Sequence, residues 1–139
     1  MEFIDLKIQF SKIEDKITKS INEVLHHGKY IMGPEVEKLE NQLSDYVNSK
    51  YCVSCSSGTD ALLMSLLAIN LKPGDAVITT PFTFIATAEV ISLLGATPIF
   101  VDIDPKTFNI NPELIEDTIV DVNNNSNINI KAIIPVNIF

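Results

Sequence analysis

The residues whose types and spacing most clearly suggest chemistry are Ser56-Ser57-Gly58-Thr59-Asp60, between a predicted strand and an apolar predicted helix. The glycine lets a ligand approach the backbone, and the first helical turn offers free N–H groups and the positive end of the helix dipole. This arrangement suits a phosphate, to which Ser57 and Thr59 can add hydroxyl donors. A plain helix N-cap, with Thr59 or Asp60 as the capping residue, explains the same residues and stays open as the alternative.

The turn differs from two common nucleotide-binding motifs. It has neither the Gly-x-Gly-x-x-Gly pattern of dinucleotide sites nor the Gly-Lys-Ser/Thr ending of a P-loop. Dinucleotides and nucleoside triphosphates are therefore disfavoured as ligands of this turn.

A second candidate feature is Pro81-Phe82-Thr83-Phe84, which follows the second predicted strand. In open α/β folds, ligands bind at the carboxyl edge of the parallel sheet, and this segment is predicted to lie there. Two aromatic side chains beside a phosphate turn can stack on a flat ring. A pair of aromatic residues in the core is the alternative interpretation.

Three other groups have simpler structural explanations. Cys52 and Cys55 have the spacing of a metal or redox pair, but positions i and i+3 of the predicted strand point to opposite faces, and no second ligand pair exists. His26-His27 suit the end of a helix. Asp102 and Asp104 suit a turn with Asp caps. We therefore predict no metal site.

The hydrophobic pattern predicts two amphipathic helices followed by alternating strands and helices. The helices are expected from Ser11 to about Gly28 and from Pro34 onward. The later elements are predicted as strands 51–55, 76–80, 97–102 and 131–136, helices 61–70, 84–94 and 112–120, and a polar loop at 121–129. Because the strands are apolar on both faces, we expect an α/β fold with a mostly parallel sheet and flanking helices.

Composition excludes several classes of partner. The 139 residues fit one domain, and 10 Lys against 18 acidic residues, with no Arg, give a net charge of −8. Nucleic acid and anionic membrane surfaces are therefore disfavoured. Without arginine, any bound phosphate must rely mainly on backbone N–H groups. The sequence begins without a secretory signal, and its longest apolar stretch, 62–69, is too short to span a bilayer, so we expect a cytoplasmic protein.

The last residues, 133–139, read as a buried strand that has no helix after it to cover it. A complete α/β domain seldom ends in this way. We therefore expect this sequence to be the front part of a longer protein, with residues 1–139 forming an incomplete domain.

Taken together, the motifs resemble the DegT/DnrJ/EryC1/StrS sugar aminotransferases, which are fold-type I enzymes that use pyridoxal phosphate. Their order and spacing agree over essentially the whole chain, and the resemblance is greatest to the type acting on UDP-2-acetamido-2-deoxy-3-oxo-glucuronate. The matching segments are FIDL at 3–6, GKYIMGPEV at 28–36, SSGTDAL at 56–62, PGDAVIT at 73–79, PFTFIATAE at 81–89, LGATP at 94–98, VDIDP at 101–105 and IIPV at 133–136.

The resemblance implies roles for particular residues. Gly58 and Thr59, with Ser57, are expected to hold the phosphate of pyridoxal phosphate. Phe84 is expected to stack on its pyridine ring, and Tyr30 to lie near a nucleotide-sugar substrate. Residues 1–139 would form the N-terminal portion of the pyridoxal-phosphate-binding domain of a homodimeric enzyme.

The implied reaction moves an amino group from an amino acid, with glutamate expected, to a keto group of a nucleotide-diphosphate sugar for surface polysaccharide or lipopolysaccharide synthesis. The lysine that binds the cofactor covalently and the acid that pairs with the pyridine nitrogen are expected beyond Phe139. This chain alone is therefore expected to hold no catalytic residue and to be inactive. Two alternatives stay open: a non-catalytic phosphate-binding α/β module, and a sugar dehydratase of the same family.

Overall fold

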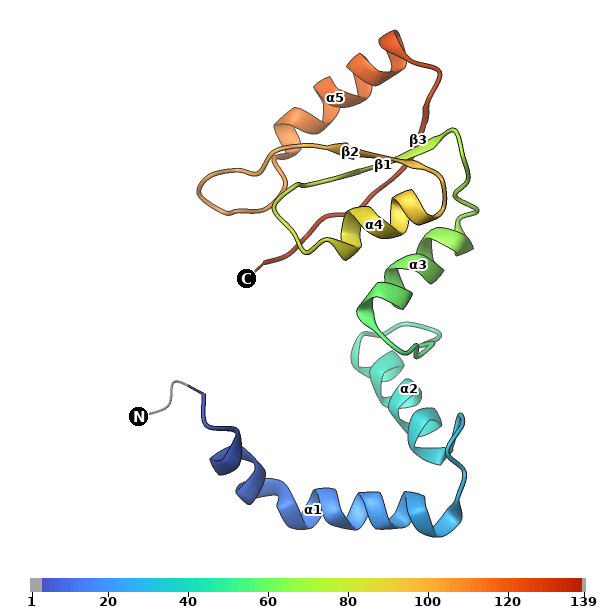
Figure 1. Ribbon diagram of the computed structural model, residues 1–139, viewed down its shortest axis with the longest axis vertical. Coiled ribbons are helices and arrows are strands. Elements are labelled where there is room, and N and C mark those ends of the chain that lie inside the picture. The colour runs from blue at the N-terminus through green and yellow to red at the C-terminus, as the bar shows by residue number, and fades with distance from the viewer. Residues whose placement is uncertain (1–3, 139) are drawn as a thin grey trace. The chain divides into compact units, whose positions relative to one another are not determined.

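The computed structural model describes residues 4–138, and the chain divides into two compact units, Met1–Ser54 and Cys55–Phe139. The first unit contains helices α1 (Leu6–His27) and α2 (Pro34–Tyr46) (Figure 1). The second contains helices α3 (Gly58–Ala68), α4 (Ala86–Leu93) and α5 (Pro112–Asn125) and strands β1 (Asp75–Thr79), β2 (Thr97–Phe100) and β3 (Asn129–Ile133).

Helix α1 begins five residues before the predicted start at Ser11. The Asp5 carboxylate accepts hydrogen bonds from the N–H groups of Lys7 and Ile8, each at 3.0 Å, and so caps the helix at that point. The predicted end is confirmed, because Gly28 adopts the left-handed conformation, with φ of 68°, directly after His27.

Helix α2 begins at Pro34 as predicted, directly after Gly33. The turn before it needs a glycine at that position, because a Cβ on Gly33 would collide with the carbonyl oxygen of Lys29. The chain can therefore turn tightly between the two helices of the first unit.

The prediction of a strand at 51–55 is wrong. These residues form no strand, and the backbone N–H of Ser54 donates to the Glu40 carboxylate at 2.7 Å instead of to a neighbouring strand. The Ser54 hydroxyl donates to the same oxygen at 2.7 Å. A side chain of α2 thus accepts the hydrogen bond that a neighbouring strand would have accepted. The first of the four predicted strands therefore does not form.

The second unit confirms the predicted α/β architecture, with a parallel three-stranded sheet in the order β2-β1-β3. Helices α4 and α5 lie on opposite sides of the sheet (Figure 1). The central strand β1 is buried along its whole length, and Ala76, Val77 and Ile78 are inaccessible to solvent. Val77 packs in one cluster with Leu66 of α3 and Val90 of α4. An apolar run buried on both faces is what a central parallel strand requires.

Several predicted boundaries are corrected. Strand β3 begins two residues early and ends at Ile133, so residues 134–138 are not strand, and Phe139 lies outside the described residues. Helix α5 continues to Asn125 through residues predicted as loop, because the polar side chains bond along the helix: the Asn125 amide donates to Asp121 at 2.6 Å. Helices α3 and α4 each differ from their predicted limits by one to three residues.

Candidate functional site

The turn before α3 is built around Ser57, which is the N-cap of the helix. Its hydroxyl accepts a hydrogen bond from the Asp60 N–H at 3.1 Å and donates to the Asp60 carboxylate at 2.9 Å. The alternative interpretation of this turn as a helix N-cap is therefore right about the cap but names Thr59 or Asp60 where Ser57 is the capping residue. Ser57 takes this place because its extended backbone puts the hydroxyl within reach of the N–H three residues later.

Asp60 is held as a charged group inside this turn. The Ser56 hydroxyl donates to its carboxylate, as the Ser57 hydroxyl does. These two bonds, that from Ser56 being the larger cause, lower the pKa of Asp60 below its ordinary value. The resulting negative charge lies in the first turn of α3, where the helix dipole favours it. The hydroxyl of Ser57 is thus already engaged in forming the turn.

Gly58 and Thr59 expose the groups that are left for a ligand. Among the described residues, no acceptor takes a hydrogen bond from the backbone N–H of either residue, and both are exposed. A Cβ placed on Gly58 would meet nothing within 4 Å, so the space beside this residue is open. Two adjacent unpaired N–H groups at a helix start can bind an anion.

The second candidate segment connects β1 to α4 and lies at the carboxyl end of the central strand. The Phe84 ring is 75% exposed, and the Phe82 ring contacts Phe108 with centroids 5.8 Å apart and planes tilted by 33°. The alternative of a core pair formed by Phe82 and Phe84 is wrong, because both side chains are exposed and Phe82 has a different ring partner. A cavity of about 220 Å³ lies beside them, lined by Pro81, Phe82, Thr83 and Ile138.

The turn at residues 56–60 and Phe84 belong to the second unit, whereas Tyr30 belongs to the first. Helices α3 and α4 both begin toward the side of the sheet at which β1 ends (Figure 1). Tyr30 lies in the loop between α1 and α2, where its exposed side chain lines a hollow of about 540 Å³ with Ile31 and Met32. Within the second unit, the free amides therefore stand at the start of α3, and the exposed ring stands just before the start of α4.

A polar cluster that the sequence pattern does not predict lies at the amino end of the sheet. Asp75 is only 4% exposed and accepts hydrogen bonds from the Asn129 amide at 3.0 Å and from the Lys72 N–H at 3.1 Å. The Lys131 ammonium lies 3.5 Å from its carboxylate and donates to the Asn70 carbonyl at 2.9 Å. Together these bonds lower the pKa of Asp75, and the hydrogen bond from Asn129 is the largest cause. The only local signal was the Pro-Gly-Asp turn.

Between residues 4 and 138, no three His, Cys, Asp or Glu side chains gather closely enough to hold a metal ion, and Cys52 and Cys55 are both free thiols. Over the same span, none of the helices is long and apolar enough to cross a membrane.

Comparison with known proteins places this geometry in a family. The sequence model of the DegT/DnrJ/EryC1/StrS aminotransferase family matches residues 11–139. The UDP-2-acetamido-2-deoxy-3-oxo-D-glucuronate aminotransferase of Pseudomonas aeruginosa is 52% identical over 139 residues, which are 100% of this chain and 37% of that protein. The 3-oxo-glucose-6-phosphate:glutamate aminotransferase of Bacillus subtilis is 40% identical over 98% of this chain and 29% of its own length.

Solved structures agree with the sequence comparison. A DegT DnrJ EryC1 StrS aminotransferase from Brucella abortus superposes with a TM-score of 0.93 at 44% identity, over 97% of this chain and 36% of that one. NtdA from Bacillus subtilis with bound cofactor PMP superposes with a TM-score of 0.76 at 39% identity, over 87% and 26%. This chain thus spans between 26% and 37% of the length of these four proteins. It belongs to the DegT/DnrJ/EryC1/StrS aminotransferase family.

Proposed function

We propose that this protein acts as a pyridoxal-phosphate-dependent aminotransferase that transfers an amino group to a keto group of a nucleotide-diphosphate sugar. The observation that carries the proposal is the family match over residues 11–139, supported by a 52% identical relative whose name specifies a UDP-linked 3-oxo sugar acid. We propose glutamate as the amino donor, since the relative from Bacillus subtilis is named for that amino acid. We also propose that the protein acts in the cytoplasm as a homodimer, and that its product is used for surface polysaccharide synthesis.

The residues present fit the cofactor. The free N–H groups of Gly58 and Thr59 offer a cradle for its phosphate, and the Thr59 hydroxyl adds a donor. Ser57 contributes by capping α3 and holding Asp60, which orients the two amides. The exposed face of Phe84 is available to cover a pyridine ring. When bound, pyridoxal phosphate supplies an electron sink for amino-group exchange.

The remaining roles follow from the same proposal. Residues 1–139 supply the N-terminal portion of the cofactor-binding domain, and Tyr30 contacts the nucleotide-sugar. The lysine that binds the cofactor covalently and the acid that keeps the pyridine nitrogen protonated lie outside these residues. The contribution of this chain is therefore to bind and orient the cofactor.

The cradle can be tested by deleting one N–H group. Gly58 occupies the first position of α3, where proline is tolerated, and the extended Ser57 before it suits an X-Pro bond. In the protein expressed from its native gene, Gly58→Pro should raise the Kd for pyridoxal phosphate at least about tenfold, as expected for losing a charge-assisted hydrogen bond. Gly58→Ala is the matched control, because it keeps the N–H and its Cβ enters open space.

The activity itself is tested with glutamate and a UDP-linked 3-oxo sugar, the aminated product being detected by mass spectrometry. Amination by the natively expressed protein, and none by residues 1–139 alone, is the expected result. Sugar dehydration without amino transfer would instead favour the dehydratase alternative. Failure to bind pyridoxal phosphate more tightly than pyridoxal, which lacks the phosphate, would contradict the cradle.

A further inference from the structure

The connection between β1 and α4 is held by hydrogen bonds within it and to the first turn of α4. The Thr80 hydroxyl accepts from the Phe82 N–H at 3.2 Å, and the Pro81 carbonyl accepts from the Thr83 N–H at 3.1 Å. The hydroxyls of Thr83 and Thr87 bond to each other at 2.9 Å. Thr80 is inaccessible to solvent and Thr87 is 6% exposed, so the two side-chain bonds are partly buried.

Phe84 lies between the two residues that the Thr83–Thr87 bond joins. Its carbonyl accepts from the Thr87 N–H at 3.2 Å, so Thr87 contacts this short segment through its backbone and through its side chain. The ring of Phe84, in contrast, is 75% exposed. The backbone of this residue is therefore fixed on both sides while its ring stays available for a ligand.

Helix α4 gives a second reason to single out this pair. Its N-cap position is occupied by Ile85, which has no side-chain cap hydrogen bond. The Thr83–Thr87 bond is thus the side-chain link that ties the first turn of α4 to the residues before it. Side chains that must meet a ligand precisely need such support from neighbours that do not touch the ligand.

We propose that Thr83 and Thr87 are positioning residues, whose paired hydroxyls fix the backbone of Phe84 so that its ring lies flat against the pyridine ring of pyridoxal phosphate. This inference rests on the proposed function. It assigns neither threonine a contact with the cofactor. It predicts that the hydroxyl of Thr87 matters for cofactor affinity, whereas its buried methyl group matters for stability.

Two substitutions at Thr87 separate these contributions. Thr87→Val keeps the side-chain shape and removes the hydroxyl, so the Kd for pyridoxal phosphate should rise about three- to tenfold. Its melting temperature should stay close to that of the wild type, because Thr83 is only partly buried and its hydroxyl can turn to water. Thr87→Ser keeps the hydroxyl and loses the methyl, so it should restore the Kd while lowering the melting temperature by a few degrees.

Thr118→Val is the matched control. The Thr118 hydroxyl donates to the Leu114 carbonyl at 2.7 Å within α5, so its loss removes a hydrogen bond far from the connection in sequence. This variant should bind pyridoxal phosphate as the wild type does. Amide hydrogen exchange without cofactor gives an independent readout: Thr87→Val, but not Thr118→Val, should accelerate exchange of the Thr87 and Ala88 amides, which bond within this segment.

Three outcomes decide the matter. The proposal is overturned if Kd follows melting temperature across the Val and Ser variants, because the pair would then have only a structural role. It is also overturned, with the proposed function intact, if Phe84→Ala weakens cofactor binding and Thr87→Val does not. Failure of the wild type to bind pyridoxal phosphate would instead overturn the proposed function, and is seen before any threonine is changed.

Discussion

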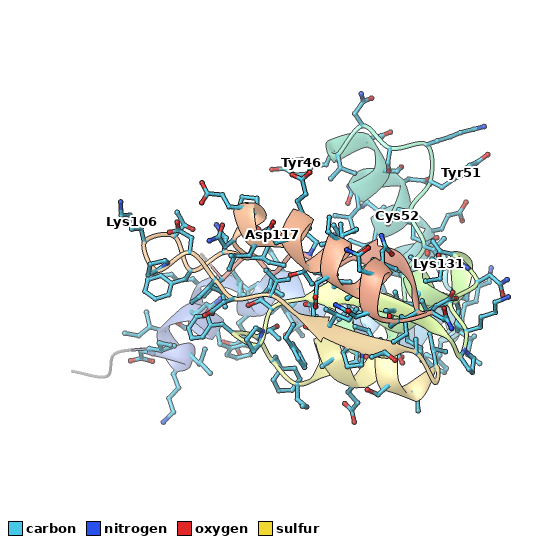
Figure 2. The ribbon with its side chains drawn as sticks, turned by 90° about the horizontal axis from the view of Figure 1, so that it is seen from above. Tyr46, Tyr51, Cys52, Lys106, Asp117 and Lys131 are labelled. Atoms are coloured by element: carbon cyan, nitrogen blue, oxygen red, sulfur yellow. The ribbon has the colours of Figure 1, made fainter. Side chains whose placement is uncertain are left out.

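The two ends of the parallel sheet use their polar and aromatic residues in opposite ways. At the amino end, Asp75 is 4% exposed and bonds to Asn129, to the Lys72 N–H and to Lys131. At the carboxyl end of β1, Phe84 is 75% exposed and a cavity of about 220 Å³ opens beside Phe82. Figure 2 shows Lys131 and Lys106 at these opposite ends.

The polar residues at the amino end hold the strands together, whereas the carboxyl end leaves the Phe84 ring available for a ligand. The amino-end hydrogen bond from Asn129 to Asp75 joins residues 54 positions apart in the sequence and so fixes β3 against β1. The bonds within the connection that follows β1 stay inside residues 80–87 and fix that segment locally. The carboxyl end of β1 itself is tied to the chain after β3, because the Thr79 hydroxyl donates to the Ile134 carbonyl at 3.0 Å. Ligands of open α/β folds bind at the carboxyl end. We therefore expect substitutions at the amino end to change stability and those at the carboxyl end to change cofactor binding.

The largest effect is expected from Asp75→Ala. Removing the carboxylate leaves the Asn129 amide, the Lys72 N–H and the Lys131 ammonium without this acceptor. The melting temperature should fall on the order of 10 °C, because unsatisfied partly buried donors are costly. Differential scanning calorimetry measures the change. A variant that melts normally but binds pyridoxal phosphate poorly would break the comparison between the two ends.

Phe84→Ala is the converse substitution. Because the ring is exposed, the melting temperature should change little, while the Kd for pyridoxal phosphate should rise about tenfold through loss of ring stacking. Phe84→Tyr keeps an aromatic face and serves as the control. Fluorescence titration gives the Kd. Equal binding by the Ala variant would remove Phe84 from the proposed cofactor site.

The stability of the amino end should depend on acid pH. The pKa of Asp75 is lowered below its ordinary value of 3.8, mainly because the Asn129 amide donates to the carboxylate. The stability that this group contributes is therefore fully present above about pH 4 and is lost as the pH falls through the lowered folded-state pKa. Thermal melts at several pH values should show the advantage of wild type over Asp75→Asn shrinking below about pH 4. A constant difference would contradict this.

The smallest effect is expected from Lys131→Gln. The Lys131 side chain is 28% exposed, and Asp75 keeps its bonds from Asn129 and from the Lys72 N–H. The melting temperature should fall by no more than about 2 °C, and high salt should reduce the difference further. A fall as large as that of Asp75→Ala would mean that charge, and not hydrogen bonding, closes the amino end.

Much of the fold of both units was predictable, because the sequence signals for it are local. The apolar run at 76–80 identified the central strand, and Pro34 and Gly28 marked helix limits in the first unit. The Ser-Ser-Gly-Thr-Asp turn predicts a helix start, but its residue types do not show which hydroxyl caps the helix. Three hydroxyl groups stand in the turn, and the backbone conformation of Ser57 selects the one that caps.

The sequence by itself determined the α/β alternation, the buried character of β1 and the two segments that expose amides and an aromatic ring. Hydrophobic period, capping residues and turn residues act over a few positions, so they are readable without coordinates. Only the tertiary structure decided that Ser54 bonds to Glu40 and residues 51–55 form no strand, that Phe82 meets Phe108, and that Asp75 meets Asn129. Such contacts join residues far apart in the chain, and packing of the whole unit selects them among many locally equivalent partners.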